Sequence, residues 1–252
     1  MKLLILAAGY ATRLYPLTKN KAKPLLEVAG KPMIEHVLAT TEDIRELDHV
    51  FIVTNEKFAR DFERWGTDYR KRHPQCPPIT VVNDHSTDDT NKLGAIGDIK
   101  LVIDSQTVDD DLLIIGGDNL FKSSLVELAK FAAQHGPTLG VYDVGDLELM
   151  KQYGNVSVDG KRRITEFVEK PPQPKTTLAA MCLYYYPRAV LPLIEQYVKE
   201  GNNPDQPGRF VAWLYRRQPV YAHQIRGQWL DIGSFETLEQ ANREFGVKRV
   251  DQ

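Results

Sequence analysis

Long cationic side chains follow the first apolar run of the chain, in the stretch AAGYATRLYPLTKNKAKP at residues 7–24. The tripeptide Ala7-Ala8-Gly9 comes directly after that run, and its small side chains would let backbone N–H groups approach a ligand. Arg13 and Lys23 are of the types that bind phosphate oxygens. The later glycines of a GxGxxG motif are missing, which argues against a nicotinamide-type pyrophosphate site. The residue types indicate either a polyphosphate-binding loop or an ordinary solvated loop.

Two acidic residues also stand at the ends of short apolar runs, in IIGGDN and in WLDIG. Asp118 follows two glycines, and Asp231 follows Trp229 and Leu230. A carboxylate at such a position needs a partner, and a hard divalent cation with oxygen ligands is a natural one. A helix cap or a turn would explain each acid equally well. Glu169 and Lys170 end another strand-like segment, where a surface ion pair is the simple alternative to ligand binding.

The elements that would position these residues alternate between short apolar runs and segments of helical period, which is typical of a mostly parallel sheet covered by helices. Helical faces are predicted after Pro32, around Phe62, and from Leu125 to Ala132. The predicted strands of this first half are Leu3–Ala7, Val50–Val53, Ile79–Val82 and Leu112–Ile115.

From about residue 139 the pattern changes. VSVDGKRRITEFVEKP alternates apolar and polar residues around Asp159-Gly160, which predicts an antiparallel hairpin. LAAMCLYYY, VYAHQI and QWLDIG are further predicted strands, and Ser234 is expected to cap a closing helix. Helices are also predicted over 189–198 and 210–215, on either side of the loop NNPDQPG. The fold class is therefore α/β: a Rossmann-like three-layer α/β/α arrangement with a mixed, mostly parallel sheet and an antiparallel ribbon.

Composition restricts the partners. The 252 residues carry 32 basic and 34 acidic side chains, and a net charge of -2 favours neither nucleic acid nor an anionic membrane. Cys76 and Cys182 are too few for a disulfide framework, and no apolar stretch approaches the roughly 20 residues that span a bilayer. A single cytoplasmic domain without linkers or repeats is expected.

The string LAAGYATRLYPLT…KPLLEVAGKPM closely resembles the signature of the sugar-1-phosphate nucleotidyltransferases, or NDP-sugar pyrophosphorylases. IIGGDNLF, YGNVSVDGKRRITEFVEKP and WLDIGSFETLEQA follow in the family's order, so the resemblance covers nearly the whole chain. It implies a GT-A-like fold in which residues 1–138 bind the nucleotide and 139–252 bind the sugar phosphate. It also implies that the C-terminal β-helix of some members is absent here.

The family's reaction, as the resemblance implies it, is attack by a sugar-1-phosphate oxygen on the α-phosphorus of a nucleoside triphosphate, with release of pyrophosphate. Arg13, Lys23 and Lys170 would be the catalytic cations, and Asp118 and Asp231 would hold Mg²⁺. The nucleotide site would contain Leu6, Ala7, Ala8, Gly9, Arg13, Lys23, Asn83, Leu93, Gly94 and Asp118. The sugar-phosphate site would contain Asn119, Gly154, Glu169, Lys170 and Tyr184, although a core position explains Tyr184 equally well.

Two departures from the family pattern leave the substrates open. Asn83-Asp84 stands where thymidylyl and uridylyl members carry a glutamine that faces the base, so dTTP or UTP is only the default. Ala180 and Cys182 stand where many members have an asparagine and a glycine, and a lost amide contact is worth on the order of 1 kcal/mol. Glucose-1-phosphate is therefore the default sugar.

Three alternative functions remain at this point. A cytidylyltransferase acting on phosphocholine or another phospho-alcohol is the first, and an aromatic box in the site would favour it. A catalytically silent NDP-sugar sensor is the second, and a glycosyltransferase is the third. The family resemblance also suggests a homo-oligomer.

Overall fold

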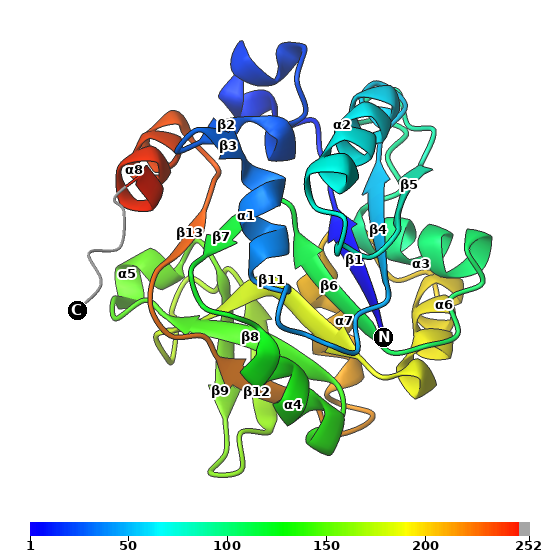
Figure 1. The fold of residues 1–252 in the computed structure, drawn as a ribbon. Coiled ribbons are helices and arrows are strands. Elements are labelled where there is room, and N and C mark those ends of the chain that lie inside the picture. Colours follow the sequence, from blue (N-terminus) through cyan, green and yellow to red (C-terminus); the bar gives the residue numbers. More distant parts are fainter. Residues whose placement is uncertain (247–252) are drawn as a thin grey trace.

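The computed structural model describes residues 1–246, and within them nine strands form one mixed sheet (Figure 1). Seven of its strands lie side by side, in the order β10 (Ile164–Glu169), β9 (Gly154–Val158), β11 (Leu178–Tyr186), β6 (Leu112–Gly116), β1 (Lys2–Leu6), β4 (His49–Thr54) and β5 (Ile79–Asn83). The other two are β8 (Thr138–Asp143), which pairs with β11, and β12 (Tyr221–Gln224), which pairs with β8.

The first half of the chain builds the parallel part of the sheet. Strand β1 pairs in parallel with β4 and β6, and β4 pairs in parallel with β5. Successive residues Leu3, Leu4 and Ile5 are all fully buried, as expected for a strand covered on both faces. The four strands predicted here are confirmed, and their carboxyl ends lie at one edge of the sheet.

The second half contributes the antiparallel part. Strand β11 runs antiparallel to β6 and β8, and β9 and β10 form the predicted hairpin. The helix predicted over 210–215 begins earlier, at Pro207, because proline fits the first turn of a helix.

Helices cover both faces of the sheet, which confirms the three-layer α/β/α prediction. One apolar cluster joins Leu3 and Ile5 to α1 (Met33–Ala39), α2 (Ala59–Arg72), α4 (Val126–His135) and α8 (Phe235–Gly246). A second cluster joins Leu4 to α3 (Ala95–Ser105), α6 (Leu191–Lys199) and α7 (Pro207–Leu214). The short helix α5 (Leu147–Met150) lies before the hairpin.

A small ribbon outside the main sheet joins distant parts of the chain. Strand β13 (Trp229–Asp231) pairs antiparallel with β7 (Asn119–Phe121), the strand that follows β6. After β13, the Ser234 hydroxyl accepts a hydrogen bond from the Thr237 N–H at 3.3 Å, as the predicted cap requires. Helix α8 then lies beside the hairpin of β2 (Glu27–Val28) and β3 (Lys31–Pro32) (Figure 1).

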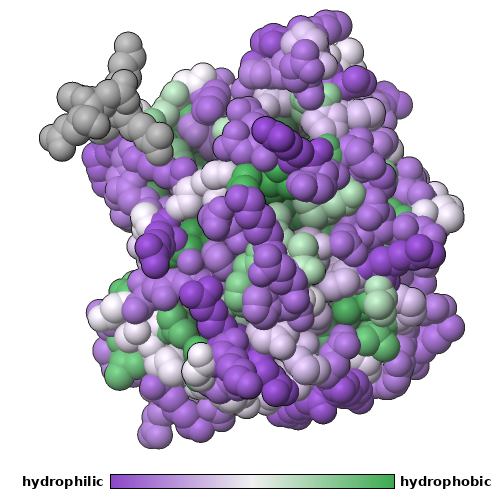
Figure 2. All heavy atoms as spheres, turned by 60° about the horizontal axis from the view of Figure 1, so that its bottom comes forward, coloured by the Kyte–Doolittle hydropathy of each residue, from purple (hydrophilic) through white to green (hydrophobic). Residues whose placement is uncertain are grey.

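The face of the molecule that Figure 2 shows is mainly polar. In the view of Figure 2, hydrophobic residues form small areas separated by hydrophilic ones. No helix within residues 1–246 combines the length and the apolar character needed to cross a bilayer.

Candidate active site

Two acidic side chains meet where β7 and β13 pair. Asp231 lies opposite Asn119 in this ribbon, and the Ile232 N–H donates to the Asp118 carbonyl at 3.1 Å. Burial and the neighbouring Asp118 carboxylate raise the pKa of Asp231 to about 6, against the influence of Lys23, Lys170 and Arg13. The structure therefore gathers both predicted metal ligands and all three predicted catalytic cations in one place.

Asp118 is held on both of its carboxylate oxygens. The Lys23 ammonium donates to Oδ2 at 2.7 Å, and the Asn119 amide donates to Oδ1 at 3.0 Å. Burial acts to raise the pKa of Asp118, but Lys23 and these hydrogen bonds lower it overall. The Trp229 indole N–H in turn donates to the side-chain oxygen of Asn119, Oδ1, at 3.0 Å. This network fixes Asp118 as an anion beside Lys23.

Gly117 allows Asp118 and Lys23 to come close together. A Cβ atom there would lie 2.8 Å from the Pro24 ring and 3.1 Å from the Leu6 carbonyl oxygen. The Gly117 N–H donates to that same carbonyl at 2.9 Å. The glycine thus lets the end of β6 lie against the segment that carries Lys23.

A cavity of about 300 Å³ adjoins the two acids. Glu169 is one of its charged residues, and burial raises the pKa of its carboxyl group despite Lys170 and Arg209 nearby. All the predicted sugar-phosphate residues line this cavity together with the two acids, namely Asn119, Gly154, Glu169, Lys170, Tyr184, Asp118 and Asp231.

The Glu169 carboxylate is packed between two glycines. A Cβ atom on Gly154 would lie 3.1 Å from its Oε2, and one on Gly208 would lie 3.2 Å from it. Both would also meet the Phe167 ring, at 2.9 and 2.7 Å. Gly154 therefore has a packing role, and the sugar contact predicted for it stays a prediction. Sequence reasoning missed Gly208.

Lys170 has a backbone conformation that lysine seldom adopts. Its φ is +44°, in the left-handed region, and its N–H donates to the Tyr153 carbonyl at 3.1 Å. Such backbones cluster at binding sites, where the surrounding fold imposes them. The turn directs this part of the chain along the cavity that Lys170 lines.

The small-residue loop after β1 is tied to the neighbouring strand. The Ala7 N–H donates to Val53 O at 2.9 Å, and the Thr54 hydroxyl donates back to Ala7 O at 3.2 Å. The Asn55 amide donates to Ala8 O at 2.9 Å, and Asn55 is fully buried. With its carbonyls held in this way, the loop has a defined conformation. Sequence reasoning missed Thr54 and Asn55, although a polar pair directly after an apolar strand was a usable signal.

The predicted base contacts lie farther along the same edge, outside the lining of the 300 Å³ cavity. The Asn83 amide donates to Glu56 at 2.6 Å, and its carbonyl oxygen accepts the His85 N–H at 2.8 Å. Gly94 has φ +77° and lies so close to the segment before α7 that a Cβ would be 2.8 Å from Pro204 O. Their roles, like that of the exposed Leu93, stay predictions.

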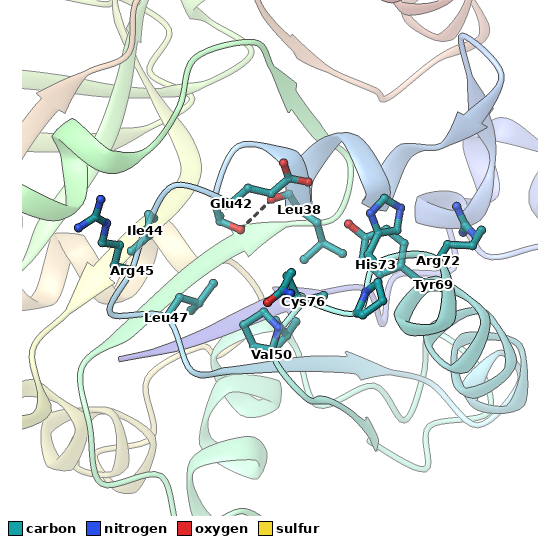
Figure 3. A pocket seen from close by; sticks show the side chains of 14 residues that line it. Leu38, Glu42, Ile44, Arg45, Leu47, Val50, Tyr69, Arg72, His73 and Cys76 are labelled. Atoms are coloured by element: carbon teal, nitrogen blue, oxygen red, sulfur yellow. Dashed lines mark hydrogen bonds between the residues drawn. The ribbon is translucent and has the colours of Figure 1, made fainter.

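A larger cavity, of about 540 Å³, lies at the opposite ends of β4 and β5 (Figure 3). Its lining includes Leu38, Val50 and Arg72 but none of the predicted site residues. Arg72 is paired with Glu35 at 2.6 Å, and the Trp65 indole donates to the same carboxylate at 3.1 Å. We therefore place the active site at the smaller cavity, which is lined by both predicted metal ligands and by Lys170.

A family model for nucleotidyl transferases matches residues 2–246. The chain belongs to this family. Family membership agrees with the resemblance seen in the sequence, and it connects the gathered cations and acids with nucleotide chemistry.

Three curated relatives are similar over nearly the whole chain. A bifunctional GlmU protein of Methanocaldococcus jannaschii is 28% identical over 96% of this chain and 54% of its own length. A glucose-1-phosphate adenylyltransferase of Clostridium novyi is 28% identical over 97% of the chain and 66% of its own length. A low-salt glycan biosynthesis nucleotidyltransferase of Haloferax volcanii is 27% identical over 96% of the chain and 65% of its own length. The chain thus spans between about half and two thirds of the length of these relatives.

Solved structures share the fold. A protein of Bacillus anthracis described as a glucose-1-phosphate thymidylyltransferase, in complex with sucrose, has a TM-score of 0.82 and 24% identity, and the match covers 100% of this chain and 98% of that one. A UDP-glucose pyrophosphorylase bound to UDP-glucose has a TM-score of 0.78 and 20% identity, with 97% of each chain covered. At these identities the structures support the three-layer fold alone.

Proposed function

We propose that the protein transfers a nucleotidyl group from a nucleoside triphosphate to a sugar-1-phosphate. A phosphate oxygen of the sugar attacks the α-phosphorus, the bond from that phosphorus to the bridging oxygen breaks, and pyrophosphate leaves. The convergence of Lys23, Lys170 and Arg13 on the Asp118–Asp231 pair, beside a cavity of about 300 Å³, carries this proposal. A sugar phosphate is already an anion, so no side-chain nucleophile is required.

Each cation has a separate task in this proposal. Arg13 binds the β- and γ-phosphates and stabilises the charge that develops on the leaving pyrophosphate. Lys23 lies beside the α-phosphate, held in position by Asp118. Lys170 binds the phosphate of the sugar, while Glu169 accepts hydrogen bonds from sugar hydroxyls in the adjoining cavity. In-line positioning and charge neutralisation are the principal requirements of phosphoryl chemistry.

The two acids have the chemistry of a magnesium site completed by substrate. Burial and the neighbouring Asp118 carboxylate raise the pKa of Asp231, and a divalent cation held by the two acids would counter both effects. No group of three His, Cys, Asp or Glu residues suited to a metal occurs in the described part of the chain, so phosphates and water would supply the other ligands, as is usual for Mg²⁺. When bound, the ion would neutralise phosphate charge.

A second candidate is a cytidylyltransferase that acts on phosphocholine. Four aromatic side chains line the cavity, namely Tyr153, Phe167, Tyr184 and Trp229, and the Tyr153 and Trp229 rings lie 5.2 Å apart. Aromatic surroundings bind quaternary ammonium groups. Glu169 in the same cavity would add an anion, so this alternative needs a direct test.

A substrate matrix distinguishes the candidates. Each common nucleoside triphosphate is combined with several sugar-1-phosphates and with phosphocholine, and pyrophosphate release is measured with Mg²⁺ present. We expect release only when both substrates are added, with a pyrimidine triphosphate and a hexose-1-phosphate as the best pair. Release with CTP and phosphocholine alone would establish the second candidate. Tight binding of an NDP-sugar without turnover in any combination would identify a sensor.

A further inference from the structure

Two buried carboxyl groups face each other beside the predicted base contacts. Asp84 directly follows β5, Asp98 lies in the first turn of α3, and they are 7% and 6% exposed. The two groups lie within hydrogen-bonding range of each other. Asp84 Oδ2 and Asp98 Oδ1 are buried, and neither has a hydrogen-bond partner among the residues of the structure. Two ionised carboxylates in this position would repel strongly, so the geometry requires a proton between them.

The surrounding charges do not remove this requirement. Burial and Asp84 together raise the pKa of Asp98 to about 8, and Lys92 is the cation that acts in the other direction. Lys92 is itself paired with Asp205, at 3.0 Å. The Tyr10 hydroxyl also lies near Asp84, and burial together with Asp84, Asp88 and Asp89 raises its pKa. Lys92 therefore compensates only part of a second negative charge, and Asp98, with a pKa of about 8, keeps its proton at neutral pH.

The pair joins two elements that border the site. On one side, Asp84 Oδ1 accepts the Ser86 N–H at 2.7 Å, and the Ser86 hydroxyl lies 3.4 Å from the hydroxyl of Tyr10, in the loop after β1. On the other side, α3 begins against the segment before α7, with the Ile96 N–H donating to Pro204 O at 2.8 Å. Residues 206–208, which follow that segment, line the 300 Å³ cavity.

We infer that a proton shared by Asp84 and Asp98 holds the loop of residues 84–94 against α3 and so positions the nucleotide-binding edge. Asp98 is a positioning residue in this arrangement and touches no substrate. Loss of the proton in alkaline solution separates the two carboxylates, loosens the loop and weakens nucleotide binding, while the steps at the Asp118–Asp231 pair are unchanged. The consequence for nucleotide binding rests on the proposed function, whereas the shared proton itself does not.

The first test needs no activity. The native protein binds this proton more tightly than the unfolded chain does, so its stability falls as the pH rises from the ordinary carboxyl range to the native pKa of Asp98, about 8. Asp98→Asn carries an amide that can donate to Asp84 at every pH. We expect the melting temperature and the hydrogen-exchange protection of residues 84–94 to fall between pH 6 and 9 in the wild type, and this fall to be absent from the variant.

Two further variants control this measurement. Asp104→Asn changes an exposed carboxylate of the same helix, which is paired with Lys100, and should keep the wild-type pH profile. Asp84→Asn keeps the oxygen that accepts from Ser86 and presents its amide to Asp98, so it should behave as Asp98→Asn does. It also serves as the second probe if Asp98→Asn folds poorly. Identical pH profiles in the wild type and in both pair variants would overturn the inference.

The second test measures kinetics with the best substrate pair from the matrix. Between pH 7 and 9, the KM for the nucleoside triphosphate should rise at least threefold more in the wild type than in Asp98→Asn. The kcat and the KM for the acceptor should change equally in both proteins. If kcat instead changed more with pH in the wild type than in Asp98→Asn, a positioning role would be contradicted. A protein without turnover that still shows the pH-dependent protection would contradict the proposed function and leave the shared proton supported.

Discussion

The two ends of the parallel strands differ in how their charges are paired. At the amino ends, Glu35 is 6% exposed and accepts hydrogen bonds from Trp65 and from Arg72, which lines a cavity of about 540 Å³. At the carboxyl ends, Asp118 pairs with Lys23, while burial and Asp118 leave Asp231 with a raised pKa beside a cavity of about 300 Å³. Glu35 is thus compensated by groups of the protein itself, whereas the raised pKa of Asp231 shows that the cations around this acid compensate it only in part.

This difference shows why cavity size alone is a poor guide to function. Burial acts to raise the pKa of Glu35, but the hydrogen bonds from Arg72 and Trp65 lower it, so the charge is stabilised by the protein itself. In the Asp118–Asp231 pair, Lys23 lowers the pKa of Asp118, but the pKa of Asp231 stays raised, and an added cation would compensate this second acid. Matched substitutions at the two ends of the strands test this contrast directly.

The largest effect is expected for Asp118→Ala. The change removes the partner of Lys23 and one of the two predicted metal ligands, so kcat should fall about a hundredfold or more. Glu42→Ala, in the lining of the larger cavity, should leave kcat within about twofold. Steady-state pyrophosphate release measures both. Full activity in Asp118→Ala would remove the metal role and with it the contrast.

Arginine substitutions give the next test. Arg13 lies close enough to lower the pKa of Asp231, whereas Arg45 lines the larger cavity. Arg13→Ala should lower kcat/KM for the nucleoside triphosphate by roughly ten- to a hundredfold, because a charge-assisted contact to the leaving phosphates is lost. Arg45→Ala should have little effect. If kcat/KM fell equally in the two variants, the loss would come from the change in the overall charge of the protein and not from a contact in the site.

Glu35→Gln should change stability and leave kcat unchanged. The native pKa of Glu35 is lowered, so this carboxylate contributes stability at neutral pH that is lost as the pH falls through that native pKa. The variant should be less stable at pH 7 by about 1 kcal/mol, which corresponds to a melting temperature lower by about 2–4 °C. The difference should shrink as the pH falls through the lowered native pKa of Glu35. A kcat change with unchanged stability would instead place Glu35 in the chemistry.

The smallest effects should come from two helical glycines. A Cβ on Gly208 would lie 2.7 Å from the Phe167 ring and 3.2 Å from the Glu169 carboxylate, whereas one on Gly66 would make an ordinary contact with Ile79 at 3.5 Å. Gly208→Ala should raise the KM for the sugar phosphate by about two- to tenfold through displacement of Glu169. Gly66→Ala should stabilise α2 by about 0.5–1 kcal/mol without changing KM. An unchanged KM in Gly208→Ala together with a raised KM in Gly66→Ala would contradict a role of Glu169 in binding the sugar phosphate.

Much of the architecture could be predicted because strands and turns carry local signals. The apolar runs of β1, β4, β5 and β6 and the Asp-Gly turn between β9 and β10 depend on residues near one another in the chain. Strand β8 and helix α3 were missed. In α3, the buried Ile96, Ile99 and Val102 have helical spacing, but Gly94 before the helix and Gly97 in its first turn resemble a loop.

The sequence by itself determined which residue types stand at strand ends, namely cations after β1 and carboxylates in IIGGDN and WLDIG. Only the tertiary structure decided that Asp231 meets Asp118, through the pairing of β7 with β13, and that Asp84 faces Asp98. The reason is physical. A residue's local preferences follow from its own backbone and close neighbours, whereas the pKa of a carboxyl group depends on burial and on charges that the fold brings near it.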